Sequence, residues 1–76
     1  MTEQIDPAVT IALIERQLQS QRHAFEDLRI AVLVEEAVED AQRAEQLKTE
    51  MKKTAKRIEK LMQLKSEAES RIQTAS

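Results

Sequence analysis

The feature that most constrains this chain is the absence of glycine and asparagine from its 76 residues. These two residues most readily adopt the positive φ angles of tight hairpins and helix ends, so a sheet or a fold with many turns is disfavoured. Charged residues make up 34% of the sequence, and Glu, Lys, Gln, Ala and Leu are abundant, which is typical of long helices and coiled coils. The sequence therefore predicts an all-α fold.

The segment Ile5-Asp6-Pro7 predicts the start of a helix. Asp6 can accept hydrogen bonds from the first free amides, and Pro7 at the first helical position lacks only an N–H that would be unpaired there. No other proline follows Pro7. We therefore expect residues 1–6 to form an N-terminal tail and helix cap. Residues 7–75 are expected to form a single helical coiled-coil domain, roughly 100 Å long if unbroken at 1.5 Å per residue.

Two heptad frames, each with mostly apolar a and d positions, fit this helix. The first has a positions Ile11, Leu18, Phe25 and Val32 and d positions Ile14, Gln21 and Leu28. The second has a positions Ile30, Ala37, Ala44, Met51, Ile58, Lys65 and Ile72 and d positions Leu33, Asp40, Leu47, Thr54, Leu61, Ala68 and Ala75. The frames differ by five residues and overlap within 28–34, where six of seven residues are apolar. A supercoil cannot pass through this offset unchanged, so the chain is expected to bend or turn near residues 34–40, or to pack there against more than one neighbour.

Two architectures satisfy these frames. The favoured one is a long helix, continuous or kinked near residues 34–40, that forms an antiparallel coiled coil with a second copy. The alternative is a helical hairpin that reverses near residue 36 and associates into a four-helix bundle. The segment 34–38 contains no turn-forming residue and would expose two valines, which favours the long helix. A reversal at Asp40, or at Thr49 as the cap of a new helix, weakens that objection.

Charges in the second frame favour antiparallel over parallel pairing of two copies. Parallel pairing sets Arg43 against Lys48 and provides no attraction. Antiparallel pairing brings together two pairs of opposite sign, Glu36 with Arg57 and Arg43 with Glu50. Each exposed pair is worth only about 0.2–1 kcal/mol, so these charges are expected to set the register and not to hold the copies together.

Apolar burial between helices is expected to supply the affinity. A chain this short rarely buries enough apolar surface alone, and the sequence has no cysteine for a disulfide, so association is expected. At roughly 25 cal/mol per Å² buried, segment 28–34 is the predicted main source. The predicted association residues are Leu28, Ile30, Val32, Leu33, Val34, Leu47, Met51, Ile58 and Leu61.

Residues that could carry chemistry are few. An acidic cluster comprises Glu35, Glu36, Glu39 and Asp40, and His23 has Glu26 and Asp27 three and four residues ahead of it. A hard cation needs six or more converging oxygens, and a zinc site needs more than one histidine or cysteine, so both features are interpreted as solvated helix surface. We predict no catalytic residue, metal site, cofactor or small-molecule substrate, and no enzyme activity.

A basic ladder is the main candidate for a polyanion contact. It comprises Lys48, Lys52, Lys53, Lys56, Arg57 and Lys60. The net charge of −2 and the pI near 5.4 argue against general polyanion binding, and no aromatic residue interleaves with the ladder to stack on bases. A solvated face that complements acidic residues of a neighbour is the favoured interpretation.

The sequence thus predicts a small helical protein–protein interaction module that acts through coiled-coil pairing, such as an adaptor, an assembly factor or a helical chaperone. The alternative is a dimeric nucleic-acid-binding regulator that uses the basic ladder. Expected partners are the chain itself, as a dimer or tetramer, and a helical protein. The start of the chain lacks the pattern of a signal peptide and the longest apolar run is five residues, so we expect a cytoplasmic protein with no membrane contact.

Overall fold

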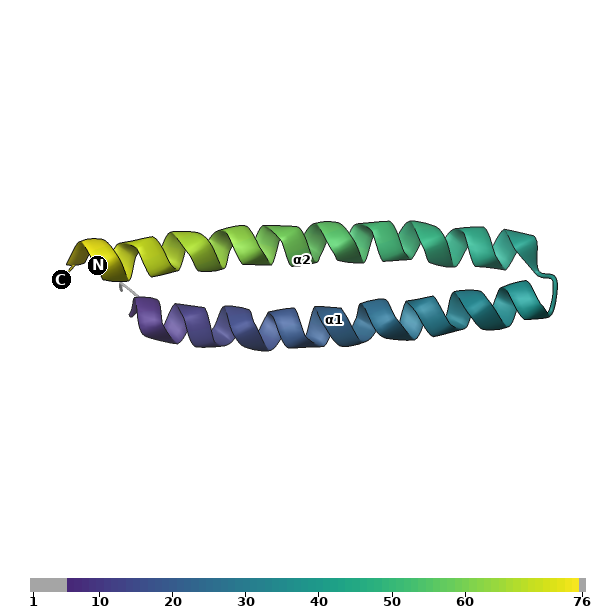
Figure 1. The fold of residues 1–76 in the computed structure, drawn as a ribbon, viewed down its shortest axis with the longest axis horizontal. Coiled ribbons are helices and arrows are strands. Elements are labelled where there is room, and N and C mark those ends of the chain that lie inside the picture. Colours follow the sequence, from purple (N-terminus) through teal and green to yellow (C-terminus); the bar gives the residue numbers. More distant parts are fainter. Residues whose placement is uncertain (1–5, 76) are drawn as a thin grey trace, which may run out of the picture.

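The computed structural model describes residues 6–75, with side chains described as far as residue 72. It contains two helices, α1 (Pro7–Ala37) and α2 (Ala41–Ala75), and the described residues contain no strand. The helices run antiparallel as a hairpin, and the start of α1 and the end of α2 lie at the same end (Figure 1). The molecule measures 56 × 19 × 18 Å. The predicted all-α fold is confirmed.

Helix α1 begins where the sequence predicts. The Asp6 carboxylate accepts a hydrogen bond of 2.9 Å from the Ala8 amide, and its carbonyl accepts one of 3.0 Å from the Thr10 amide. Pro7 occupies the first helical position, where its missing N–H removes no intrahelical bond. The predicted cap is therefore confirmed, and residues 1–5 of the predicted tail lie outside the described residues.

The chain reverses at residues 38–40 through a Schellman motif that uses no glycine. Glu39 has a φ angle of 64°, in the left-handed region that helix ends usually assign to glycine. The amides of Glu39 and Asp40 donate to the carbonyls of Glu36 and Glu35 at 3.1 and 2.9 Å, which satisfies the free carbonyls of α1. Asp40 then caps α2, because its carboxylate accepts a bond of 3.0 Å from the Arg43 amide.

This turn corrects the favoured expectation of one continuous or kinked helix. The chain forms the alternative hairpin, and the reversal lies at residues 38–40, which includes Asp40, one of the positions considered, and is not centred on residue 36. The expectation rested on the lack of a turn former. In the structure Glu39 adopts the left-handed conformation that the turn requires, which costs roughly 1–2 kcal/mol relative to a right-handed conformation.

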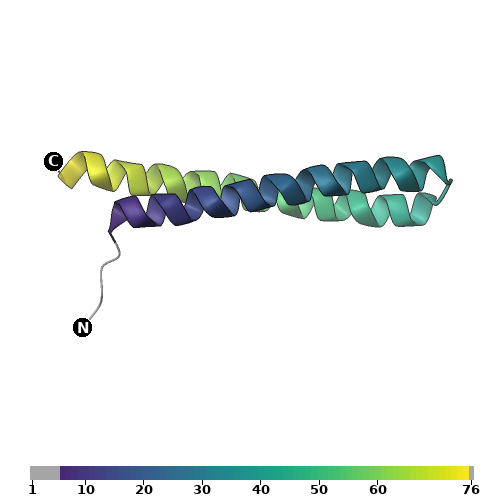
Figure 2. The same cartoon turned by 90° about the horizontal axis from the view of Figure 1, so that it is seen from below.

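The hairpin core uses both predicted heptad frames, one from each helix. From α1 it buries or half-buries the first frame, namely Ile11, Ile14, Leu18, Gln21, Phe25, Leu28 and Val32. From α2 it buries or half-buries the second frame from residue 44 to residue 68, namely Ala44, Leu47, Met51, Thr54, Ile58, Leu61, Lys65 and Ala68. The two helices cross at a shallow angle near the middle of the hairpin, as coiled-coil packing requires (Figure 2).

The core between the helices is thin and partly polar. Thr54 is only 2% exposed, and its hydroxyl donates a hydrogen bond of 2.9 Å to the Glu50 carbonyl, so no donor is buried without a partner there. Gln21 and Lys65 occupy seam positions that leucine or isoleucine would fill in a stronger coiled coil. A single two-helix layer of this kind buries little apolar surface for its length, and further association would stabilise it.

A candidate association surface on helix α1

The apolar segment 28–34 is divided between two faces of α1. Leu28 and Val32 lie on the face that packs against α2, where Val32 is 7% exposed. Ile30, Leu33 and Val34 point away from α2 and are 56%, 62% and 53% exposed. This division explains why six of the seven residues in this segment are apolar, because the same two turns of the helix supply apolar side chains to two different faces.

Four large apolar side chains therefore lie exposed at the turn end of the hairpin. We call Ile30, Leu33, Val34 and Val38 the turn-end patch; Val38, in the turn itself, is 67% exposed. Scattered apolar residues are ordinary on a protein surface, but a contiguous apolar cluster marks a contact site or an aggregation hazard. A β-branched cluster without charge adds to that hazard, so this patch needs cover.

Helix α1 exposes further apolar side chains near its N-terminal end. Val9 and Leu13 are each 50% exposed and share a helix face with Ile30 and Val34, because residues spaced alternately by four and three lie along one stripe. We call this stripe, opposite the hairpin core, the outer face of α1. Helix α2 also exposes Met62, Leu64 and Ile72, but these lie along the flanks and the end of the core seam.

Six of the nine predicted association residues lie inside the hairpin, namely Leu28 and Val32 of α1 and four residues of α2. Leu47 is buried, and Met51, Ile58 and Leu61 are half-buried against α1. The predicted pairing of two copies would have covered these side chains with a second chain. The reversal at residues 38–40 brings α1 of the same chain against them instead, which leaves only residues of segment 28–34 free to meet a partner.

The structure places each of the four predicted register charges on the surface. Glu36 forms an ion pair of 3.4 Å with Lys48 of α2, and Glu50 forms one of 3.5 Å with Lys53. Arg43 donates a hydrogen bond of 3.3 Å to the Gln46 side chain. Arg57 lies 16 residues into α2, about 24 Å from the turn, so the hairpin does not bring it to Glu36. A role for these charges between two copies stays a prediction.

Lys48 links the two helices electrostatically near the turn. Its ammonium also pairs with Glu45 at 3.3 Å. Hydrogen bonds with Glu45 and Glu36 raise the pKa of Lys48 above its ordinary value of 10.5. These groups are solvent-exposed, so water and salt screen the attraction, and its contribution is to the alignment of the turn end more than to stability.

The basic ladder lies along α2, away from the turn-end patch. Two of its members, Lys48 and Lys53, are paired with carboxylates. Lys52, Lys56, Arg57 and Lys60 are exposed. The ladder is thus a solvated strip with part of its charge compensated within the chain.

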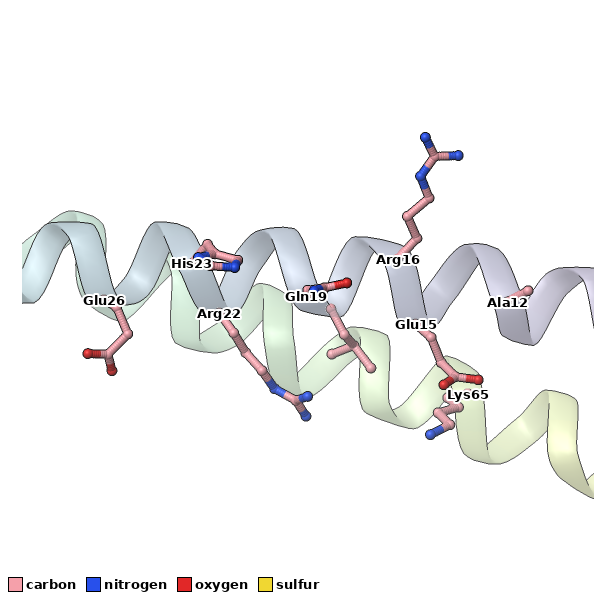
Figure 3. A pocket seen from close by; sticks show the side chains of 9 residues that line it. Ala12, Glu15, Arg16, Gln19, Arg22, His23, Glu26 and Lys65 are labelled. Atoms are coloured by element: carbon pink, nitrogen blue, oxygen red, sulfur yellow. The ribbon is translucent and has the colours of Figure 1, made fainter.

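A shallow groove lies on one side of the hairpin. It is lined mainly by polar side chains of α1, with Lys65 contributed by α2 (Figure 3). Arg16 points away from α2, whereas Glu15, Arg22 and Glu26 project towards the side of α1 on which α2 lies. The groove opens broadly to solvent and so lacks the enclosure of a small-molecule site. Within residues 6–75 no three His, Cys, Asp or Glu side chains gather closely enough to hold a metal ion.

Comparisons of the chain with models of protein families, with curated proteins and with solved structures found no match. Neither helix of the described part is both long and apolar enough to cross a membrane. The outer face of α1, with the turn-end patch at its C-terminal end, therefore stands as the candidate site on physical grounds. The sequence identified its residues as apolar and assigned segment 28–34 to two heptad frames, and the fold determined which of the two faces α2 covers and which stays exposed.

Proposed function

We propose that this protein is a helical protein–protein interaction module that binds another helix along the outer face of α1. The observation that supports this proposal is the turn-end patch. Its four apolar side chains are more than half exposed, although residues next to them in the sequence are buried in the hairpin core. A neighbouring helix with an apolar stripe is the partner that fits a straight helical face, because it meets such side chains at the same spacing.

The size of the patch indicates how much of α1 a partner must contact. Full burial of a Val, Leu or Ile side chain is worth about 1.5–3 kcal/mol, so covering four half-exposed ones contributes roughly 3–6 kcal/mol. Association costs about 4–15 kcal/mol in lost translational and rotational freedom. The patch alone is therefore too small to hold a complex, and a partner must extend along α1 towards Val9 and Leu13.

A dimeric nucleic-acid-binding regulator is the second candidate. It is supported by the exposure of Lys52, Lys56 and Lys60 on α2, and it is weakened by the carboxylates already paired with Lys48 and Lys53. Titration of binding to random duplex DNA tests it. Affinity that persists near 0.15 M salt would favour this candidate, whereas no binding at low salt would exclude it. A cytoplasmic location remains an expectation from the sequence.

Site-specific photo-crosslinking in the source cells tests the interaction module. A photoreactive residue is placed at Leu33, in the turn-end patch beside the outer face of α1, and at Gln63, which is exposed on α2, as the matched control. We expect one discrete, identifiable protein adduct from position 33 and none from position 63. Equal or absent crosslinking from the two positions would contradict the proposal.

A further inference from the structure

We infer that the helix bound by the outer face of α1 is the same face of a second copy of this chain, paired antiparallel about a two-fold axis that passes between Gln21 and Arg22. This inference rests on the proposed function and names its partner. The carrying observation is the order of side chains along the outer face. It is apolar at both ends and polar in the middle, with charges of opposite sign on the two sides of the axis.

Eight residues form the stripe, all of them exposed in the hairpin and spaced alternately by four and three. In order they are Val9, Leu13, Arg16, Ser20, His23, Asp27, Ile30 and Val34. This spacing is that of a and d positions, so the stripe can form a second coiled-coil seam on the side of α1 opposite to α2. Because the stripe and the hairpin seam follow the same heptad, α1 can pack against both neighbours along its length.

Antiparallel pairing places each residue of the stripe opposite one defined residue of the second copy. The paired residues are those whose numbers add to 43. At the ends of the seam, Val9 meets Val34 and Leu13 meets Ile30, each twice by symmetry. Ile30 and Val34 are the residues of the turn-end patch that lie on the stripe. Apolar side chains of the second copy therefore cover both of them.

The middle of the seam is complementary in charge. Arg16 meets Asp27 twice, on either side of the axis, and Ser20 meets His23. Arg16 and Asp27 cannot pair with each other within one chain, since 11 residues separate them along the helix. Each such exposed pair is weak, and two of them are enough to choose one orientation over another.

The residues that flank the seam also fit without conflict. On one flank Leu33 meets Ala12 and Glu26 meets Gln19, whose amide can donate to the carboxylate. On the other flank the side chains are small or neutral, namely Thr10 opposite Ala31 and Gln17 opposite Ala24. No like charges meet in this register on the stripe or on its flanks.

Other registers of the same two faces lose this match. Pairing shifted by seven residues in one direction sets Arg16 against Val34 and Ser20 against Ile30. Shifting the other way sets Val9 against Asp27. Parallel pairing places Arg16 against Arg16 and Asp27 against Asp27 of the second copy, which repel. The order of residues thus selects one register among the alternatives.

The dimensions of the seam indicate a weak dimer. From Val9 to Val34 the helix rises about 38 Å, and neighbouring helices pack about 8–10 Å apart, so the two facing strips cover roughly 800 Å² in total. Specific interfaces bury about 1,200–2,000 Å², and weak transient ones lie below that range. We therefore expect dissociation in the micromolar range, with the hairpin as the monomer.

Mixed-disulfide trapping tests both the occupant and the register, because the chain has no cysteine of its own. Two variants are made, Leu13→Cys and Ile30→Cys, and oxidised separately and as an equimolar mixture. We expect a crosslinked dimer from the mixture and none from either variant alone, since positions 13 and 30 meet each other and not themselves. A crosslink from either variant alone would indicate parallel pairing, and no crosslink in any sample would exclude the seam; either result overturns the inference.

Charge reversal provides the second readout, by sedimentation equilibrium. Arg16→Glu and Asp27→Arg should each raise the dimer dissociation constant about tenfold, and the double variant should restore it. Lys56→Glu, on the outer side of α2, is the matched control and should leave the constant unchanged. Circular dichroism of each variant checks that the hairpin is folded. Failure of the double variant to recover would refute the register.

These experiments distinguish failure of the self-pairing inference from failure of the proposed function. If the wild-type chain is a monomer at millimolar concentration, the self-pairing inference falls. A discrete adduct of position 33 with a different protein would then still support the interaction module. If neither a second copy nor another protein is trapped at position 33, both proposals are wrong.

Discussion

The substitution Glu39→Gly tests the hairpin at the residue on which the reversal depends. Glu39 occupies the left-handed region with a φ angle of 64°, where a side chain with a β-carbon is strained by roughly 1–2 kcal/mol. Glycine removes that strain. It also gains conformational freedom in the unfolded chain, which lowers stability by about 0.5–1 kcal/mol.

The expected balance is a gain of about 0.5–1 kcal/mol in the free energy of unfolding. For a chain of this size, that corresponds to an increase of roughly 2–8 °C in the melting temperature. The alternative of a continuous helix predicts a change of the opposite sign, because glycine inside a helix costs about 1 kcal/mol relative to a good helix former. The sign of the change therefore distinguishes the two architectures.

Thermal and urea unfolding followed by circular dichroism measure this change. Gln46→Gly is the matched control, because Gln46 is exposed inside α2, in its second turn, and the variant should lose about 1 kcal/mol. All samples need the same protein concentration, since dimerisation raises apparent stability. If Glu39→Gly lowers stability as much as Gln46→Gly does, the reversal at residues 38–40 is refuted.

Three further predictions follow from the contacts described above. Asp40→Ala removes the cap of α2 and should cost about 0.5–2 kcal/mol in urea unfolding, whereas no loss would show that the carboxylate does not hold the Arg43 amide. Leu18→Ala, at a core position only 3% exposed, should cost about 2–5 kcal/mol, while Leu33→Ala should leave the stability of the dilute monomer nearly unchanged; equal losses would contradict the assignment of faces. Because the pKa of Lys48 is raised in the folded chain, its ion pairs stabilise the hairpin fully at pH values below the ordinary pKa of 10.5 and lose that effect as the pH rises through the folded pKa. Melts of wild type and Lys48→Gln should therefore converge as the pH is raised above 10.5, and a difference that stays constant would argue against the pairing.

The sequence alone was sufficient for much of the fold. The absence of glycine and asparagine disfavoured a sheet. Asp6 and Pro7 indicated the start of α1 at the observed residue. Both heptad frames were also readable, because burial at every third and fourth residue requires apolar side chains at that spacing. The structure buries or half-buries the first frame along α1 and the second along α2 from residue 44 to residue 68.

The sequence offered residue 36, Asp40 and Thr49 as positions for a reversal, and only the tertiary structure decided among them. Local preference disfavours a left-handed Glu39, and no pattern in residues 34–40 singles it out. The strain is offset by contacts distant in sequence, since Leu18 and Ile14 become covered by α2 only when the chain turns back. Local sequence rules do not sum such contacts, which is why the continuous helix was favoured and the hairpin formed.

The same reversal determined which apolar residues became a candidate site. Within segment 28–34 the sequence places Val32 in the first heptad frame and Leu33 in the second, but it gives no reason to cover one and expose the other. Packing against α2 buries Val32 to 7% exposure and leaves Leu33 at 62%, because a helix can turn only one face to a single neighbour. The order of residues in the sequence gives α1 two apolar faces. Packing against α2 determined which of them remained exposed.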